Sequence, residues 1–502
     1  MSGQFRREAM VLDCSRAQTG LEVAELIAAK RGFRRVKGYE REGGTLAGAH
    51  VVAFVCRRSG GGESPRQARV RPIDRRKGQG QDDCAVRACL MEERSVADSL
   101  PPLPSWIGLG AFNFFAAAVE TGFGPFLPVY LTRSGWSQGA VGLALSVGAI
   151  ASVASQVPGG LLVDHVHQKR LICAASLGAV GMSALVFAFW PGLAAVWGAE
   201  ILYAFGTAVL APGIAALTLS LCGHQAFGER VGNNARYASL GNAAAAAVLG
   251  LVAYRISRQA VFLLAAAMTA PAVASLLMIR PGRIDARRDH PALLRPRERT
   301  ARPWHVFVEL HMHTFAVCVM LFALANAAML PVALNGLAAR HEAAGVATTG
   351  SIVALQVVVV LFAPWIGRAA ERWGRWPVLV AGFAALPVRG LLFATLPGPG
   401  ALIGFELLDG ASAAVMGIMI PLIAADLTRK TGFLNLAIGS FGLAASLGAT
   451  FSTTAAGWIA GRFGLRVAFL ALAAAGTVAL LVVLLVMPET RPAKARRKVS
   501  AA

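Results

Sequence analysis

Charged residues make up only 15% of the 502-residue sequence, whereas hydrophobic residues make up 56% and the mean hydropathy is +0.57. A soluble protein of this length needs more polar surface to cover its core. The scarcity of charge therefore favours a membrane protein. Acidic residues are also few beside basic ones (27 against 48). Because the basic residues lie in loops and tails beside apolar segments, we expect an anionic lipid surface, not nucleic acid, as their partner.

The sequence also lacks the motifs of metal proteins and common enzymes. Its seven cysteines include no CxxC pair, so we expect free thiols and neither a disulfide framework nor a metal site. His311 and His313 are two residues apart and do not share a helix face, which disfavours a metal site there. There is no GxxxxGK[ST] loop, Ser/His/Asp arrangement or HExxH motif. We expect no cofactor and no enzymatic activity.

Residues 1–105 differ from the rest of the chain because they are rich in arginine and glycine. This composition predicts a disordered basic extension, in which only Leu21–Arg31 could form a short helix. The first apolar run, residues 45–56, is too short to cross a bilayer core of about 30 Å. We expect Met91 to be the biological start, and peptides from residues 1–90 in the native protein would contradict this. The alternative is a genuine flexible cytoplasmic tail.

Twelve apolar segments follow, each near or above the about 20 residues that a tilted spanning helix needs. A basic stretch with eight arginines and several prolines divides them six and six. We therefore predict an all-α membrane protein with twelve transmembrane helices in two six-helix bundles, at 106–280 and 305–488, a linker at 281–304 and a basic tail at 489–502. The predicted spans are 106–131, 139–163, 171–190, 193–218, 234–254, 259–279, 313–334, 347–369, 377–397, 400–425, 436–460 and 466–487.

The basic residues alternate between the two sides of the predicted membrane. With the N-terminus placed inside, the inner loops and tail carry 22 basic residues and the outer loops carry six. Positive residues are retained on the cytoplasmic side of a membrane. Both termini are therefore expected in the cytoplasm.

Two charged loops repeat about 200 residues apart, each between the second and third apolar segments of its half. Each has a glycine, a carboxylate four residues later and then a basic cluster. A charged loop duplicated in this way predicts a duplicated membrane bundle, an arrangement of transporters whose repeats move against each other around a central site. The loop residues are Gly160, Asp164, Lys169 and Arg170 in the first copy and Gly367, Glu371, Arg372, Gly374 and Arg375 in the second.

The duplication extends into the helices themselves. Glu200 and Glu406 fall at the same point of the fourth and tenth predicted helices. Asn234 and Asn435, in the fifth and eleventh, each precede a glycine by seven residues, and a run of small residues follows each glycine. Small residues on a membrane helix allow a neighbouring helix to approach closely.

With these features, residues 106–490 resemble the major facilitator superfamily. The second charged loop is similar to the family's inner-loop pattern, Gly-x-x-x-Asp/Glu-Arg-x-Gly-Arg, while the first departs from it at His165 and His167. Pro488-Glu489-Thr490 also resembles a common family ending. The resemblance implies two bundles related by pseudo-twofold symmetry, alternating access by rocking, and inner-gate loops that control conformation. The alternative for Asp164 and Glu371 is a simple topogenic charge.

The resemblance does not identify a cargo. Glu200 stands where many relatives have an arginine, and the fifth helix lacks the Gly-Pro signature of antiporters. Both departures disfavour a drug/proton antiporter. The chain is most similar to a bacterial branch without assigned substrates, which implies a monomer in the bacterial inner membrane.

Few charged residues lie inside the predicted spans, where each costs about 2.5–3.5 kcal/mol on insertion scales. Arg389, Glu406 and Asp409 lie nine residues before, eight after and eleven after the turn at Gly398, and are therefore at similar depth. We predict that Arg389 pairs with Glu406 or Asp409, as a static ion pair or as a coupling site. Glu120 has no cation nearby in sequence. It is our first candidate for proton coupling; the alternative is a hydrogen bond to a neighbouring helix.

Glu200, Glu406 and Asp409 are further candidates for proton coupling. Six uncharged polar residues are candidates for a central cavity, although each alone is more often a helix–helix hydrogen bond than a ligand. They are Asn113, Gln156, Tyr203, Asn242, Asn326 and Gln356.

The sequence thus predicts a secondary transporter of a small, partly hydrophobic organic solute. It is driven by protons, another coupling ion or the solute's own gradient. Export is favoured because no positive cluster is available to clamp an anion. A proton-coupled uptake symporter is the alternative, and a membrane scaffold or sensor is an alternative of another class. The two intact charged loops argue against a scaffold, since a static protein has no need of a gate.

Overall fold

The computed structural model describes residues 9–13, 33–35, 51–56, 103–122, 124–280, 310–339, 344–395, 398–429 and 431–491. The predicted helix at Leu21–Arg31, the start at Met91, the linker at 281–304 and the tail beyond residue 491 lie outside these residues. The chain forms two compact units, Met1–Arg87 and Ala88–Ala502.

The first unit contains a small antiparallel sheet. Its strands are β1 (Ala9–Asp13), β2 (Phe33–Arg35) and β3 (Val51–Cys56), in the order β1-β3-β2. The sheet differs from the expectation that residues 1–105 lack strands. Composition averaged over the whole stretch indicates disorder, but β3 is a short run rich in valine, which favours a strand.

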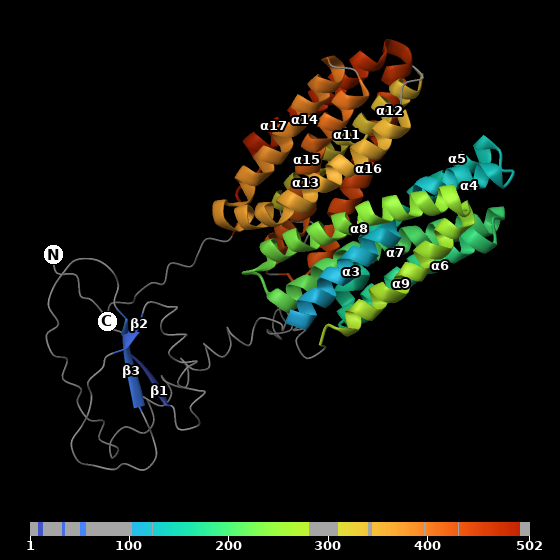
Figure 1. Ribbon diagram of the computed structural model, residues 1–502. Coiled ribbons are helices and arrows are strands. Elements are labelled where there is room, and N and C mark those ends of the chain that lie inside the picture. The colour runs from blue at the N-terminus through green and yellow to red at the C-terminus, as the bar shows by residue number, and fades with distance from the viewer. Residues whose placement is uncertain are drawn as a thin grey trace, which may run out of the picture. The chain divides into compact units, whose positions relative to one another are not determined.

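From Leu103 onward every described element is helical, and the helices form two groups (Figure 1). Serine side chains cap two of the helices: the Oγ atoms of Ser137 and Ser257 accept hydrogen bonds from the backbone N–H of Ala140 and Ala260. The N-terminal bundle contains α3 (Leu103–Gly122), η1 (Gly124–Phe126), α4 (Leu127–Arg133), α5 (Gln138–His165), α6 (Lys169–Phe189), α7 (Leu193–Cys222), α8 (Phe227–Arg255) and α9 (Arg258–Leu277).

The second group of helices is the C-terminal bundle. Gly464 ends α16 with a positive φ of 87°, a conformation that glycine adopts easily. The bundle contains α11 (Leu310–Asn326), α12 (Met329–Ala339), α13 (Ala344–Trp373), α14 (Arg375–Thr395), α15 (Pro399–Leu427), α16 (Leu434–Phe463) and α17 (Leu465–Val486).

Eleven helical segments among the described residues are long and apolar enough to cross a membrane. They coincide with the second to twelfth predicted spans. The first predicted span is divided between α3, η1 and α4. The seventh is divided between α11 and α12, with a turn at Ala327 and Ala328. Hydropathy located these spans, but it contained no information on the two breaks.

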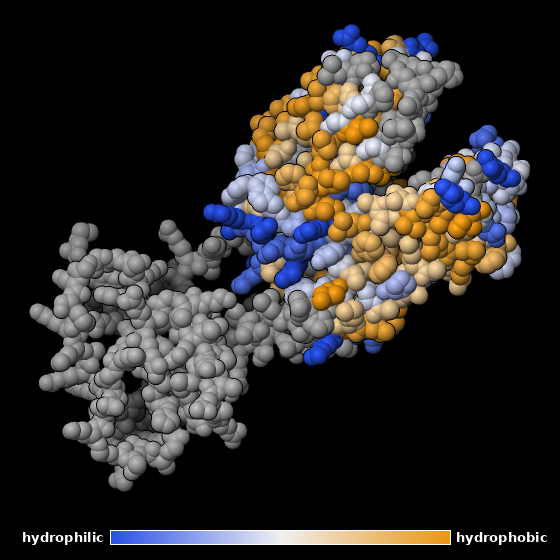
Figure 2. Space-filling view, viewed as in Figure 1, coloured by the Kyte–Doolittle hydropathy of each residue, from blue (hydrophilic) through white to orange (hydrophobic). Residues whose placement is uncertain are grey.

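The surface of the helical unit suits a lipid environment. Large apolar side chains are exposed along the helix flanks, including Ile150, Leu361 and Leu485 at 70%, 66% and 81%. Hydrophilic residues gather toward the ends of the helices in the face that Figure 2 shows. Such a distribution would be unstable in water but is expected in a bilayer.

Each bundle has an apolar core of its own. Phe112, Leu177 and Phe262 are buried in the core of the N-terminal bundle. The core of the C-terminal bundle is built around buried aromatic residues such as Phe383, but it also includes Phe227 at the start of α8. The C-terminal core therefore extends onto the N-terminal bundle, at the ends of the helices that are predicted to face the cytoplasm.

Candidate functional site

The carboxylate of the first charged loop crosses from one bundle to the other. Asp164, near the end of α5, accepts hydrogen bonds from the backbone N–H groups of Asn435 and Leu436 (3.1 and 2.8 Å) and from Asn435 Nδ2 (2.8 Å). These N–H groups belong to the first turn of α16 and have no partner within that helix. Because the N-terminus of a helix carries partial positive charge, the buried Asp164 caps it favourably.

The carboxylate of the second charged loop makes the corresponding contact in the opposite direction. Glu371, near the end of α13, accepts hydrogen bonds at Oε1 from the backbone N–H groups of Gly228 and Glu229 (2.6 and 3.3 Å). Both donors lie in the first turn of α8, in the N-terminal bundle. Each repeat thus contributes one carboxylate that caps a helix of the other repeat, and both contacts require the inner ends of the bundles to be together.

Glycines let the bundles touch at this inner gate, which we define as the contacts of α5 with α16 and of α13 with α8. A Cβ atom on Gly160 would collide with the backbone of Asn435, and one on Gly367 with the backbone of Gly228. Gly439 lies against the backbone carbonyl of Gln156 in the same way. Close backbone packing of this kind is possible only without side chains.

Glycines at the outer ends of α5, α8 and α16 are not in such contact. Added Cβ atoms would meet no atom within 4 Å at any of five outer-end glycines. The contacts between the bundles, as far as the described glycines report them, are therefore concentrated in the inner halves of these helices. The five glycines are Gly139 and Gly142 of α5, Gly250 of α8, and Gly457 and Gly461 of α16.

Replacing Gly232 with valine is expected to open the inner gate, because a Cβ there would meet the carbonyl oxygen of Ala363 in α13. The reporter is an Ile438→Cys thiol on α16, in a chain without its native cysteines, labelled by a maleimide from the cytoplasmic side. We expect labelling to accelerate several-fold. Gly250→Val, on the same helix where space is open, is the matched control. Equal labelling rates in the two variants would contradict this role of Gly232.

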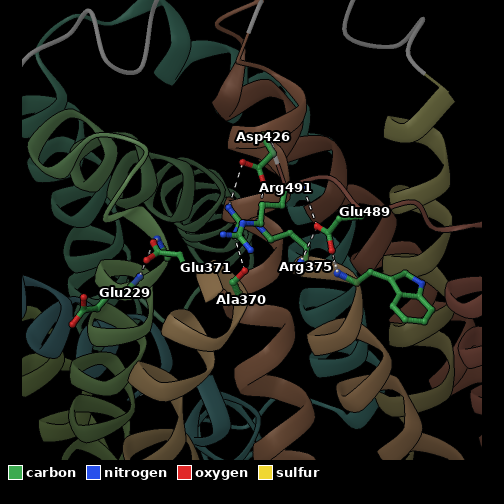
Figure 3. A network of polar contacts seen from close by, with 9 residues as sticks. Glu229, Ala370, Glu371, Arg375, Asp426, Glu489 and Arg491 are labelled. Carbon is green, nitrogen blue, oxygen red and sulfur yellow. Dashed lines mark hydrogen bonds and ion pairs between the residues drawn. The ribbon is translucent and has the colours of Figure 1, made fainter. Parts of the chain in front are cut away.

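A second network of polar contacts joins the inner ends of α13, α14 and α15 to the segment that follows α17 (Figure 3). Arg375 Nε donates to Asp426 Oδ2 at 2.8 Å, and Nη1 donates to the carbonyl of Ala370 at 2.8 Å. Glu489 accepts from the backbone N–H groups of Arg375 and Trp376 (2.9 and 3.1 Å). These contacts hold the end of α13, and with it the Glu371 cap, in a fixed position.

One histidine lies beside the inner gate. Burial, and secondarily the positive charge of Arg429, lower the pKa of His224 to about 4. His224 follows α7 in the N-terminal bundle, whereas Arg429 follows α15 in the C-terminal bundle. At neutral pH His224 is therefore uncharged and adds no repulsion between the two sides of the gate.

A buried charge cluster occupies the C-terminal bundle. Arg389 Nη2 of α14 donates to Glu406 Oε1 of α15 at 2.5 Å. Nη1 donates to Asn326 Oδ1 at 2.6 Å and lies 2.9 Å from Asp409 Oδ1, in an ion pair without hydrogen-bond geometry. Arg389 and Glu406 are only 1% and 0% exposed. Arg389 thus contacts both of the carboxylates between which the depth comparison left a choice.

The equivalent region of the N-terminal bundle has carboxylates without a described cation. Tyr203 of α7 donates its hydroxyl to the backbone carbonyl of Glu120 at 2.6 Å, in the last turn of α3. Glu200, the repeat counterpart of Glu406, packs against Gly148 of α5. Among the described residues no ion pair involves either glutamate. The two repeats therefore differ: one balances its buried carboxylates with Arg389, and in the other no described cation pairs with Glu120 or Glu200.

Comparison with known proteins agrees with this duplicated architecture. The family model of the Major Facilitator Superfamily matches residues 109–334 and 314–502. The chain belongs to the major facilitator superfamily. An uncharacterised MFS-type transporter of Mycobacterium tuberculosis (H37Rv) is 36% identical over 391 residues, 76% of this chain and 93% of the relative. A multidrug resistance protein B homolog of the same organism is 28% identical over 189 residues, 36% of this chain and 34% of that protein.

Solved structures of the superfamily have the same fold. The E. coli fucose:proton symporter FucP covers 76% of this chain and 98% of its own, with a TM-score of 0.56 and 17% identity. The proton:xylose symporter XylE covers 77% of this chain and 96% of its own, with a TM-score of 0.61 and 14% identity. At these identities the similarity shows the superfamily fold alone.

Within this superfamily fold, the six polar candidates have different surroundings. Asn113 donates from Nδ2 to the carbonyl of Leu109 at 2.8 Å, a bond within its own helix and not between two helices. Gln156 lies at the inner gate, where Oε1 contacts Gly442. Asn242 is half-buried on α8, and Gln356 has a buried Oε1 that accepts no hydrogen bond from the described residues. Tyr203 and Asn326 contact the buried charged residues described above.

The remaining residues of the charged loops support the inner ends of the helices. Lys169 is buried and donates from Nζ to the carbonyl of Val163 at 2.8 Å, while Arg170 is half-buried. The carbonyl of Arg372 accepts from Arg491 Nη1 at 2.9 Å. Gly374 has φ +114° and packs against Glu489.

Sequence reasoning missed several residues of these sites. Asp426 gave no signal beyond its place at the end of a predicted helix. Gly228 and Gly232 were not singled out because their role depends on a partner 130 or more residues away. The two helix breaks did carry a signal, since the triplet Leu-Pro-Val recurs directly after them, at Leu127 and at Leu330. Proline in a membrane helix is tolerated where neighbouring groups satisfy the freed backbone.

Proposed function

We propose that this protein is a secondary active transporter that moves a small, partly hydrophobic organic solute by alternating access. The observation that carries the proposal is the pair of reciprocal caps, Asp164 on α16 and Glu371 on α8. Both caps lie at the inner ends of the bundles and can be released together by rocking. We infer that this state faces outward, with both termini in the cytoplasm, and that the protein acts as a monomer in the bacterial inner membrane.

The charges inside the helices support a neutral or cationic solute and coupling to protons. Arg389 is enclosed by Asn326, Glu406 and Asp409, so it is not available to bind an anionic solute. Glu120 and Glu200 have no described counter-ion. A carboxyl group in a low-dielectric environment can take up a proton on one side of the membrane and release it on the other. This arrangement weakly favours export in exchange for protons.

The decisive experiment measures efflux and uptake of a compound library in proteoliposomes, with and without a pH gradient. Specific transport of any compound supports the transporter proposal. Its dependence on an imposed pH gradient supports proton coupling, and its direction separates export from uptake. Absence of transport for every compound, with the two caps intact by spectroscopic measurement, would favour the scaffold or sensor.

Replacing Glu120 with glutamine is expected to abolish transport driven by a pH gradient, because the amide cannot exchange a proton. Movement of the solute down its own gradient is expected to continue. Glu298→Gln makes the same change in the predicted linker between the bundles, outside the predicted spans, and is the control that should retain both activities. A variant that still accumulates solute with the pH gradient would remove Glu120 from the coupling mechanism.

A proton-coupled uptake symporter is the second candidate. The similar folds of two proton symporters favour it, although they show the fold alone. Overexpression in cells distinguishes the two directions, because a symporter produces accumulation of the solute and an exporter produces resistance to it.

A further inference from the structure

The seventh span is broken next to the charge cluster of the C-terminal bundle. Its inner half, α11, ends at Asn326, and its outer half, α12, begins at Met329. At the turn between them, the backbone N–H of Ala328 donates to Ser452 Oγ of α16 at 3.2 Å. Another helix therefore satisfies an amide at the turn, so the break leaves this group with a hydrogen-bond partner.

The last residue of α11 is bound directly to the cluster. Asn326 Oδ1 accepts from Arg389 Nη1 at 2.6 Å, and the same nitrogen lies 2.9 Å from Asp409 Oδ1. Asn326 is an uncharged partner of the Arg389 guanidinium. Through Asn326 the guanidinium contacts the seventh span. The hydrogen bond from Arg389 to Asn326 therefore becomes weaker or stronger with the attraction of Glu406 and Asp409 for the same guanidinium.

The cluster has one more acid than base. Glu406 and Asp409 share Arg389, so the three residues carry a net negative charge unless they hold a proton, and such a charge is costly in a buried site. Oε2 of Glu406 is buried without a hydrogen-bond partner among the described residues. Among the described residues, the thiol of Cys318 is the other titratable group within the surrounding helices and away from their ends. The remaining charged or titratable groups stand at helix ends: His311, His313, Arg368, Glu371, Arg372, Arg375, Asp426, Arg462 and Arg466.

Space beside α12 allows it to move. A cavity of about 380 Å³ is lined by Ala333 and Leu337 of α12 and by Phe393 and Phe469 on the opposite side. The ring of Phe393 is 5.3 Å from the guanidinium carbon of Arg389. Arg389 thus contacts the wall of the cavity as well as the residue at the break.

We propose that Asn326 is a positioning residue that ties the break of the seventh span to the charge state of Arg389, Glu406 and Asp409. Proton exchange in the cluster and displacement of α12 are then one event. The inference rests on the proton-coupled transport proposed above and specifies where the coupling acts on the outer half of the C-terminal bundle.

The test follows α12 directly and needs no solute. Spin labels are attached to cysteines introduced at Asn335 of α12 and Leu470 of α17, both exposed, in a chain without native cysteines. Distance distributions are measured in lipid nanodiscs at acidic and alkaline pH. We expect a pH-dependent change in the parent that is lost in Asn326→Ala and in Asp409→Asn.

Two variants guard against loss of structure. Asn326→Gln keeps a neutral amide oxygen that can accept from Arg389 and adds no charge to the cluster, so it should retain the pH response. Asn113→Ala makes the same truncation as Asn326→Ala in the first span, where the side chain bonds only within its own helix, and should also retain it. A pH response that persists in Asn326→Ala, or that is absent from the parent, overturns the proposal. Failure of transport in proteoliposomes with an unchanged spectroscopic pattern would instead overturn the proposed function.

Discussion

Replacing Asp164 with alanine is expected to shift the protein away from the state in which the inner gate is closed. The carboxylate accepts three hydrogen bonds at the start of α16, and its loss leaves the backbone N–H groups of Asn435 and Leu436 without that partner. Hydrogen bonds to charged groups contribute about 1.5–3 kcal/mol each but do not add independently, so we expect about 2–4 kcal/mol in total. This corresponds to a change of about 30- to 1,000-fold in the ratio of closed to open gates.

Labelling of the Ile438→Cys thiol from the cytoplasmic side measures this ratio. His165→Ala is the adjacent control, since His165 is exposed and its ring bonds only to the carbonyl of Leu161 in its own helix. Glu371→Ala should produce a similar shift through the opposite cap, and the double variant tests whether the two caps act together. An unchanged labelling rate in Asp164→Ala would mean that Asp164 does not hold the gate closed and serves only as a topogenic charge.

Replacing Arg389 with alanine is expected to destabilise the C-terminal bundle and abolish transport. The change leaves Glu406, which is 0% exposed, and Asp409 as uncompensated neighbouring acids. Removal of one partner from a buried ion pair costs about 3–5 kcal/mol in soluble proteins. The measurement is the fraction of monodisperse protein that survives heating in detergent, compared with transport in proteoliposomes.

A neutral version of the cluster separates structure from coupling. The triple variant Arg389→Met, Glu406→Gln and Asp409→Asn removes all three charges together, so it should recover most of the lost thermal stability. It should not recover transport driven by a pH gradient. Full transport in the triple variant, or in both Arg389→Ala and Asp409→Asn, would leave the cluster as a static ion pair.

Much of the architecture could be predicted because a bilayer imposes simple rules. A spanning segment must satisfy its own backbone hydrogen bonds, so length and hydropathy suffice to locate helices such as α5 and α17. The depth of a residue in a helical hairpin follows from the rise per residue. This rise predicted that Arg389, Glu406 and Asp409 lie at a similar depth. The duplicated loops predicted equivalent positions for Asp164 and Glu371.

The partners of these residues were beyond the reach of local patterns. Asp164 caps a helix 271 residues away, and Glu371 one 143 residues away. Gln156 was one of six polar candidates in the sequence, and only the packing of α5 against α16 places it beside Gly439 and Gly442 at the inner gate. Asn326 was one of six polar candidates until the break of the seventh span brought it to Arg389.

The sequence by itself determined a duplicated set of apolar helices, the loops that carry charge and the few charged residues inside the spans. These follow from periodicity, length and hydropathy, which are properties of the chain read in order. Only the tertiary structure decided which bundle each carboxylate contacts, which end of the bundles is closed and which buried acids have a cation. Those properties depend on packing between segments that are far apart in the sequence. A carboxylate can cap a helix, and a glycine can allow close backbone contact, only when folding brings the partner segment beside it.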